Sequence, residues 1–133
     1  MTRDEKYMYW LDAAEYDMGT AEAMYASGRW FYVVFMCQQA IEKLIKGLYN
    51  YYIDDNVPRV HNIQEICDKV SGKLPHKISE RNYTLCKKLT SYYIAHRYPD
   101  FISKVGANVD KSTANDILLE SKEFFVWLTD LKK

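Results

Sequence analysis

The stretch WFYVVFMCQQAIEKLIKGLYNYY, residues Trp30–Tyr52, decides how the rest of this chain is arranged. It contains no proline, and its one glycine, Gly47, lies in the last third. Apolar residues recur at steps of three and four, which places their side chains on one side of an α-helix. This stripe consists of Val34, Cys37, Ile41, Leu44, Leu48 and Tyr51, and the row beside it of Phe31, Phe35, Gln38, Glu42, Ile45 and Tyr49. We predict a central helix with neighbours on more than one side.

A polar stripe interrupts the apolar surface in the later part of this helix. Its members are Gln39, Lys43, Lys46 and Asn50. If this stripe faces solvent, replacing Lys43 with alanine should change the stability of the protein only mildly.

Composition indicates one ordinary globular domain spanning 1–133. The 133 residues can bury a core without disulfides or metal. Twelve tyrosines suggest helices that pack with solvent-accessible edges, or an interface, because each ring carries a hydroxyl that needs a hydrogen-bond partner. The 18 basic and 18 acidic residues cancel, which argues against binding nucleic acid through bulk charge.

The cysteines and the N-terminus point to a cytoplasmic protein. Cys37, Cys67 and Cys86 are odd in number, widely spaced and never in a C-x-x-C pair, so we expect reduced thiols. The charged N-terminus MTRDEKYMYW has no apolar run behind it and does not look like a signal peptide. The longest apolar run, 30–37, is too short to span a bilayer. We expect a soluble protein with no membrane association.

Five helices are predicted, near 3–27, 29–53, 62–71, 79–96 and 110–131, and no sheet. Thr2 with Glu5, and Asn62 with Glu65, have the spacing of N-terminal caps. Gly28 can take the left-handed conformation that closes a helix, and the short connection there makes the first two helices antiparallel neighbours. The inward positions of the other helices are Tyr7, Leu11, Ala14, Met18, Ala21 and Tyr25; Ile63, Ile66 and Val70; Leu85, Leu89, Tyr92 and His96; and Ala114, Ile117, Ser121, Phe124, Leu128 and Leu131.

Arg97 is the charged residue whose placement most suggests a function. It follows the fourth helix, and Pro99 ends that helix because the residue before a proline avoids helical geometry. A rigid turn R-Y-P-D could hold the guanidinium for a phosphate or a carboxylate. The alternative is a structural role, in which Arg97 caps the last carbonyls of the helix or pairs with Asp100.

Other candidate groups have weaker patterns. His96 lies on the apolar side of its helix, where a histidine is usually a hydrogen-bonded core residue. His61 and His76 lie in loops, and the three histidines share no spacing of a metal site, so we expect no metal and no cofactor. A basic strip, Lys73, Lys77, Arg81 and Lys88, could face an RNA backbone or an acidic partner, but such a strip is more often a solvated helix face.

Three segments, in this order, resemble the HEPN family (higher eukaryotes and prokaryotes nucleotide-binding domain). They are WLDAAEYDMGTAEAMYASGRW, FMCQQAIEKLIKGL and LTSYYIAHRYPDF. The resemblance covers about residues 5–125, and it is closest to the prokaryotic branch, with a Q-x-x-E-K-x-x-K second helix, a loop histidine after it and an R-Y-P-D exit.

The resemblance implies an all-α, up-and-down four-helix bundle, here with one additional short helix, and a homodimer. It also implies a minimal nucleotidyltransferase as a possible partner, often in a toxin–antitoxin pair. Nuclease members of the family carry R-x4-6-H and cleave RNA without metal at the dimer interface. This chain departs from that pattern, since the positions at the right distance from Arg97 hold Ile102, Ser103 and Lys104. No other arginine of the chain is followed by a histidine at the R-x4-6-H spacing.

Two functions follow from this resemblance and departure. The first is a non-catalytic module that binds nucleotide, RNA or a partner and acts with a minimal nucleotidyltransferase. The second is a metal-independent ribonuclease with a rearranged site, in which His96 or His61 replaces the missing histidine and Arg97 and His96 are the catalytic candidates. The residues expected to bind nucleotide or partner are Arg97, Tyr98, Asp100, His61, Lys43 and Lys46. We favour the first function.

Overall fold

The computed structural model of the chain describes residues 1–97 and 109–133. These residues contain five helices and no strand: α1 (Arg3–Ala26), α2 (Trp30–Tyr52), α3 (Ile63–Val70), α4 (Glu80–His96) and α6 (Lys111–Asp130). Each predicted boundary lies within one residue of the observed one. The prediction of an all-α bundle with one additional short helix is confirmed.

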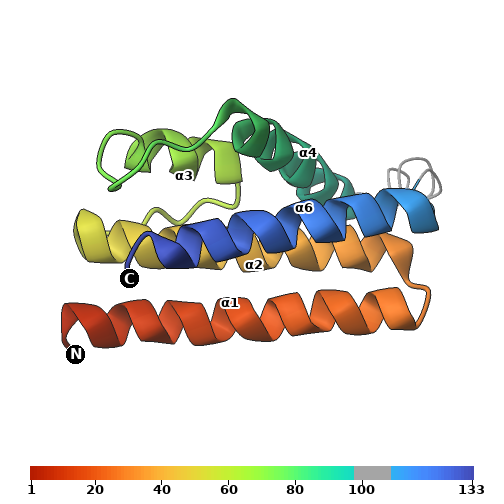
Figure 1. Cartoon of the computed structure of the whole chain (residues 1–133), viewed down its shortest axis with the longest axis horizontal. Helices are drawn as coiled ribbons and strands as arrows, with labels where there is room; N and C mark the ends of the chain where they lie inside the picture. Colours follow the sequence, from red (N-terminus) through yellow and green to blue (C-terminus); the bar gives the residue numbers. More distant parts are fainter. Residues whose placement is uncertain (98–108) are drawn as a thin grey trace.

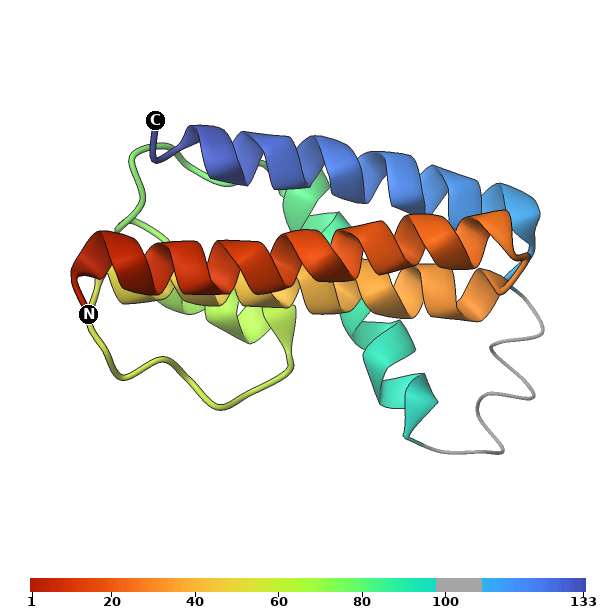
Figure 2. The ribbon, with the colours of Figure 1, turned by 90° about the horizontal axis from the view of Figure 1, so that it is seen from below.

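α2 is the central helix, as its apolar pattern predicted. α1 and α2 form an antiparallel pair joined at Gly28, whose φ of 75° lies in the left-handed region. α6 runs alongside α2 with the same direction, while α3 and α4 lie on another side of α2 (Figure 1). The second view shows α4 crossing the bundle obliquely (Figure 2). Because α4 is inclined, its C-terminal end diverges from α2, where the chain leaves the helix at Arg97.

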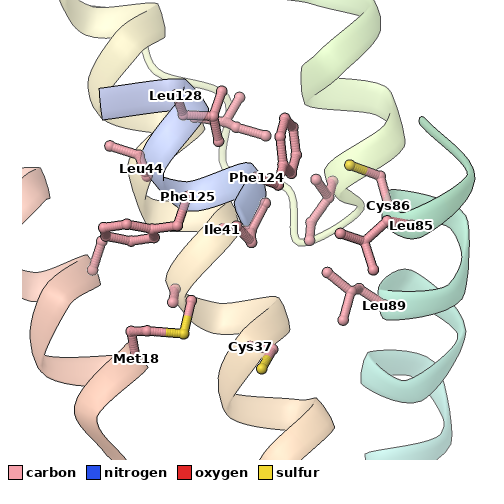
Figure 3. Close-up of a cluster of buried hydrophobic side chains, with 14 of the residues drawn as sticks. Met18, Cys37, Ile41, Leu44, Leu85, Cys86, Leu89, Phe124, Phe125 and Leu128 are labelled. Atoms are coloured by element: carbon pink, nitrogen blue, oxygen red, sulfur yellow. The ribbon is translucent and has the colours of Figure 1, made fainter. Parts of the chain in front are cut away.

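The core is formed where α1, α4 and α6 meet α2. Ile41, Leu44, Leu85, Leu89 and Leu128 have almost no solvent-exposed surface. Figure 3 shows these side chains pointing toward one another around Phe124. The predicted inward positions of α1, α3 and α6 are buried or half-buried, as are those of α4 up to Tyr92. Burying an aliphatic side chain of this size contributes about 1.5–3 kcal/mol, so this cluster supplies much of the stability of the fold.

Four helices begin at side-chain caps, and two of these are the caps that the sequence indicated. At the start of α4, Ser79 Oγ accepts from the backbone N–H of Asn82 at 3.2 Å. Thr2 accepts from the backbone N–H of Glu5 at 3.1 Å, and the Glu5 carboxylate accepts in return from Thr2 N at 3.1 Å. Asn62 accepts from Glu65 N at 3.1 Å, and Asp110 from Thr113 N at 2.8 Å. Each cap satisfies backbone donors that the helix itself leaves without an acceptor.

The polar stripe of α2 does not face solvent, contrary to the condition under which replacing Lys43 would be mild. Lys43 donates to Asp17 of α1 at 2.5 Å, and Asp17 is buried. Lys46 and Asn50 are also buried. The stripe is covered by α1 and by the segment after α2, because α2 has neighbours on that side as well.

None of the helices within the described residues is both long enough and apolar enough to cross a membrane.

Candidate functional site

A buried carboxylate on α2 organises the polar side chains of the bundle. Glu42 is 4% exposed. Its Oε1 accepts from Gln38 Nε2 at 2.9 Å, and its Oε2 accepts from Lys46 Nζ at 3.2 Å. His61 Nδ1 lies 3.1 Å from the same Oε2. Burying a carboxylate is costly unless donors converge on it, and three side chains supply those donors here.

This cluster fixes the position and the orientation of His61. The imidazole Nδ1 faces Glu42, and Gln38 Nε2 also donates to the backbone carbonyl of His61 at 3.0 Å. A carboxylate oxygen only accepts hydrogen bonds, so in this contact His61 Nδ1 is the donor. The other ring nitrogen, Nε2, therefore remains for a ligand, either as an acceptor or, in the imidazolium, as a donor.

Tyr93 of α4 provides an aromatic surface beside this imidazole. The rings of His61 and Tyr93 are stacked, with centroids 4.9 Å apart and planes 25° apart. Phe35 stacks on Tyr93 at 6.1 Å and 9°. The Arg97 guanidinium carbon lies 5.5 Å from the centroid of the Tyr93 ring, within the range of a cation–π interaction. α2, α4 and the segment before α3 therefore bring a histidine, an arginine and two aromatic rings together.

A cavity of about 330 Å³ lies at this junction. Arg59, His61, Thr90, Tyr93 and Arg97 are among the residues that line it. Arg59 and Arg97 are exposed, whereas Thr90 is buried, and its hydroxyl has no hydrogen-bond partner among the described residues. Two guanidinium groups, an imidazole, an aromatic ring and an unused hydroxyl can together bind an anion attached to a planar group.

The predicted site residues fall into three groups. Arg97 and His61 line the same cavity, and Lys46 reaches His61 indirectly, through Glu42. Lys43 points to α1, where it pairs with Asp17, and does not line this cavity. The Tyr98 and Asp100 predictions, and the predicted position of the His96 side chain, lie outside what the structure describes.

Several residues of the site were not among the predicted binding residues. They are Gln38, Glu42, Arg59, Thr90 and Tyr93. The spacing of Gln38, Glu42 and Lys46 at intervals of four was a usable signal, because residues four apart are neighbours on a helix surface. Arg59, Thr90 and Tyr93 had no such signal, since their role depends on how α4 and the segment before α3 meet.

The other candidate features add nothing to this site. The described residues include no group of histidine, cysteine and carboxylate side chains that could hold a metal ion. Lys77, Arg81 and Lys88 are exposed, and Arg81 lies 3.7 Å from Glu123 of α6. That strip therefore has the character of a solvated helix face.

Comparison with known proteins identifies the family to which this chain belongs. The HEPN domain family matches residues 7–131, so the chain belongs to the HEPN family. The crystal structure of the protein TT1696 from Thermus thermophilus is similar to this one, with a TM-score of 0.81 and 21% identical residues. That similarity covers 95% of this chain and 98% of the other, and it supports the fold alone. No curated protein matches the chain.

Proposed function

We propose that this HEPN protein is a binding module for a nucleotide or for single-stranded RNA, without catalytic activity of its own. The ligand occupies the cavity between α4 and the segment before α3, with phosphate at Arg97 and Arg59. The module acts with a minimal nucleotidyltransferase, as one half of a toxin–antitoxin-like pair.

The observation that carries this proposal is the pairing of two guanidinium groups with stacked rings around one cavity. Arg97 and Arg59 can each donate two hydrogen bonds to a phosphate, which makes arginine the usual residue for such contacts. The rings of His61 and Tyr93 offer a wall against which a base can pack. A volume of about 330 Å³ is at the lower end of the range for small-molecule sites and suits a single nucleotide.

Calorimetric titration with adenosine monophosphate and with a short single-stranded RNA tests the binding function. Arg97→Ala should weaken binding by roughly tenfold or more, because a charge-assisted hydrogen bond contributes about 1.5–3 kcal/mol. Arg97→Lys keeps the charge and loses the planar fork, so it should have an intermediate effect.

Arg81→Ala is the matched control, because Arg81 is an exposed arginine of α4 that does not line the cavity. It should leave binding unchanged. Equal effects of the Arg97 and Arg81 variants, or no binding by the unmodified protein, would refute the proposal. Melting temperatures of all variants should agree within about one or two degrees, since both arginines are exposed.

The partner assignment predicts that a reading frame for a minimal nucleotidyltransferase lies beside this gene and that the two proteins copurify when expressed together. The absence of such a reading frame from the gene neighbourhood would contradict the partner assignment and would leave the binding function untouched.

A second function, ribonuclease activity at a rearranged site, is favoured by one specific observation. His61 and Arg97 line the same cavity although they do not form the R-x4-6-H pattern, and Glu42 holds His61 by Nδ1. In that geometry His61 Nε2 would take the proton of an RNA 2′-hydroxyl as its oxygen attacks phosphorus. The same nitrogen would return a proton to the leaving 5′-oxygen, while the two arginines stabilise the charge on phosphorus-bound oxygens.

Cleavage of a labelled RNA in the presence of a metal chelator distinguishes the two functions. The ribonuclease predicts activity that both His61→Ala and Arg97→Ala abolish, with His76→Ala, at an exposed loop histidine, unaffected. RNA that is bound but remains intact supports the non-catalytic module.

A further inference from the structure

A second, larger cavity adjoins the candidate site at one end of the bundle. Its volume is about 500 Å³, and it lies between the N-terminal part of α1, the C-terminal part of α2 and the segment after α2. Lys6, Trp10, Lys46, Asp55 and Arg59 are among its lining residues. Nothing in the proposed binding function requires this cavity.

The charge on its walls favours an anion. Three basic side chains and one carboxylate line it. Lys6 pairs with that carboxylate, Asp55, at 2.9 Å, and Asn50 donates to Asp55 at 3.0 Å. Arg59 forms no ion pair within residues 1–97 and 109–133, so its charge is left for a ligand.

The hydrogen bonding of the buried Lys46 ammonium also points to a ligand. Its side chain is 9% exposed, and within the described part of the chain its ammonium donates only to Glu42 Oε2. An ammonium group has three N–H donors, so two of them are unused at the wall of the cavity. A buried ammonium with unused donors is costly unless an acceptor or ordered water meets them.

The two cavities are connected through shared residues. Arg59 lines both of them. Lys46 of the larger cavity and His61 of the smaller one contact the same oxygen, Glu42 Oε2, at 3.2 and 3.1 Å. An anion that accepts from Lys46 would draw the ammonium away from Glu42 and strengthen the attraction between Glu42 and His61.

We propose that the cavity lined by Lys6, Lys46 and Arg59 is a second binding site, for phosphate or a small phosphate-bearing molecule. Lys46 supplies the buried donors, Arg59 the exposed fork, and Trp10 an apolar wall. Occupation of this site is transmitted to the neighbouring cavity through Lys46, Glu42 and His61.

NMR titration with inorganic phosphate at constant ionic strength tests the site. The indole N–H signal of Trp10, assigned with Trp10→Phe, should shift and saturate, and the Cε1–H signal of His61 should follow the same curve. The charged and titratable groups that face His61 in this measurement are Glu42 directly, Lys46 through Glu42, and Arg59, Tyr93 and Arg97 around the cavity.

Two variants of the site and one control decide the outcome. Lys46→Gln should weaken phosphate binding by roughly tenfold or more, whereas Lys43→Gln, one turn away and paired with Asp17, should not. Asn56→Asp adds a carboxylate to the rim at an exposed residue and should weaken binding several-fold without affecting folding, so it serves if Lys46→Gln is unstable.

Arg97→Ala separates this site from the proposed nucleotide site. The Trp10 response should persist in that variant, even if nucleotide binding is lost. No saturable shift of Trp10, equal effects of Lys46→Gln and Lys43→Gln, or loss of the Trp10 response in Arg97→Ala would overturn the second site. A parallel titration with adenosine monophosphate identifies the source of the phosphate: tighter binding than phosphate indicates a nucleotide, and equal binding indicates the phosphate group alone.

Discussion

Glu42 lowers the stability that this position of α2 could provide, but its carboxylate positions the polar side chains of the candidate site. It occupies a position on α2 where an aliphatic residue would pack without cost, and it is 4% exposed. The carboxylate is tolerated because Gln38, Lys46 and His61 surround it. Buried ion pairs of this kind usually contribute little net stability over an apolar pair, yet removing one partner is strongly destabilising.

Glu42→Ala should therefore destabilise the protein by about 3–5 kcal/mol, since it leaves the buried Lys46 ammonium without its acceptor. Urea unfolding measures this change. Glu22→Ala is the control, because Glu22 pairs with Lys122 at 2.6 Å but both are about half exposed, and the expected loss is about 0–1 kcal/mol. Equal losses in the two variants would contradict a buried organising role for Glu42.

At the level of helices, α1 and α2 approach each other closely at Gly47. A Cβ atom added at Gly47 would lie 2.7 Å from the Cβ of Trp10. Neither backbone can shift easily, because the pair is held along its length by the seam from Tyr7 to Tyr25. Gly47 thus sets the distance between the two helices, and Trp10 in turn forms a wall of the larger cavity.

Gly47→Ala should lower the stability by about 1–3 kcal/mol from overpacking, although alanine has the better helix propensity. Gly19→Ala provides the matched comparison, because Gly19 lies within α1 with no atom within 4 Å of the added Cβ. That substitution should raise the stability by about 0.5–1 kcal/mol. Gly47→Ala should lower the melting temperature and Gly19→Ala should raise it. A higher melting temperature in both variants would show that the two helices can move apart without cost.

The cap of α6 should make part of the stability depend on pH. The Thr113 backbone N–H that donates to Asp110 holds the pKa of that carboxyl below its ordinary value. A carboxyl with a lower pKa in the folded state adds stability above its unfolded pKa, and this contribution is lost as the pH falls through the folded pKa. Asparagine keeps the accepting oxygen and cannot titrate.

The difference in unfolding free energy between the unmodified protein and Asp110→Asn should therefore be constant near neutral pH and change as the pH falls below about 4. Urea unfolding over a pH series measures it. A difference that stays constant into strong acid would show that the Asp110 charge makes no contribution.

At the scale of the whole molecule, we predict a homodimer, which the family implies. From the sequence, Tyr92, Tyr93, Tyr98 and Phe101 cannot all face one small core, which predicts an exposed aromatic cluster at an interface. The structure supports this expectation only in part. The ring centroids of Tyr92 and Phe31 are 6.3 Å apart, and the Tyr93 ring stacks on Phe35. Both tyrosine rings therefore pack against α2 within one chain. Tyr98 and Phe101 lie outside the described residues. Tyr9 and Tyr16, on the exposed side of α1, are 67% and 79% exposed and offer a surface for a second copy.

Light scattering at micromolar concentration should give twice the mass of the chain. Tyr16→Lys should shift the distribution toward monomer if α1 forms the contact. A monomer mass for the unmodified protein at all concentrations would refute the dimer.

Helix boundaries, caps and inward faces were predictable because they follow from local chemistry. The backbone hydrogen bonds of a helix join residues four apart, and the 3–4 spacing of Ile41, Leu44 and Leu48 specifies which face is buried whatever covers it. The caps at Thr2 and Asn62 likewise involve groups three residues apart. The spacing of Glu42 between Gln38 and Lys46 is equally local.

The partners of the polar residues depended on the tertiary structure. Lys43 and Lys46 are three residues apart on one helix, yet Lys43 meets Asp17 of α1, whereas Lys46 lies at the wall of a cavity formed with α1 and the segment after α2. His61 reaches Glu42 across 19 positions of sequence because of the path taken by the segment after α2. Such meetings depend on crossing angles and loop paths, which result from the packing of the whole core and have no local signal.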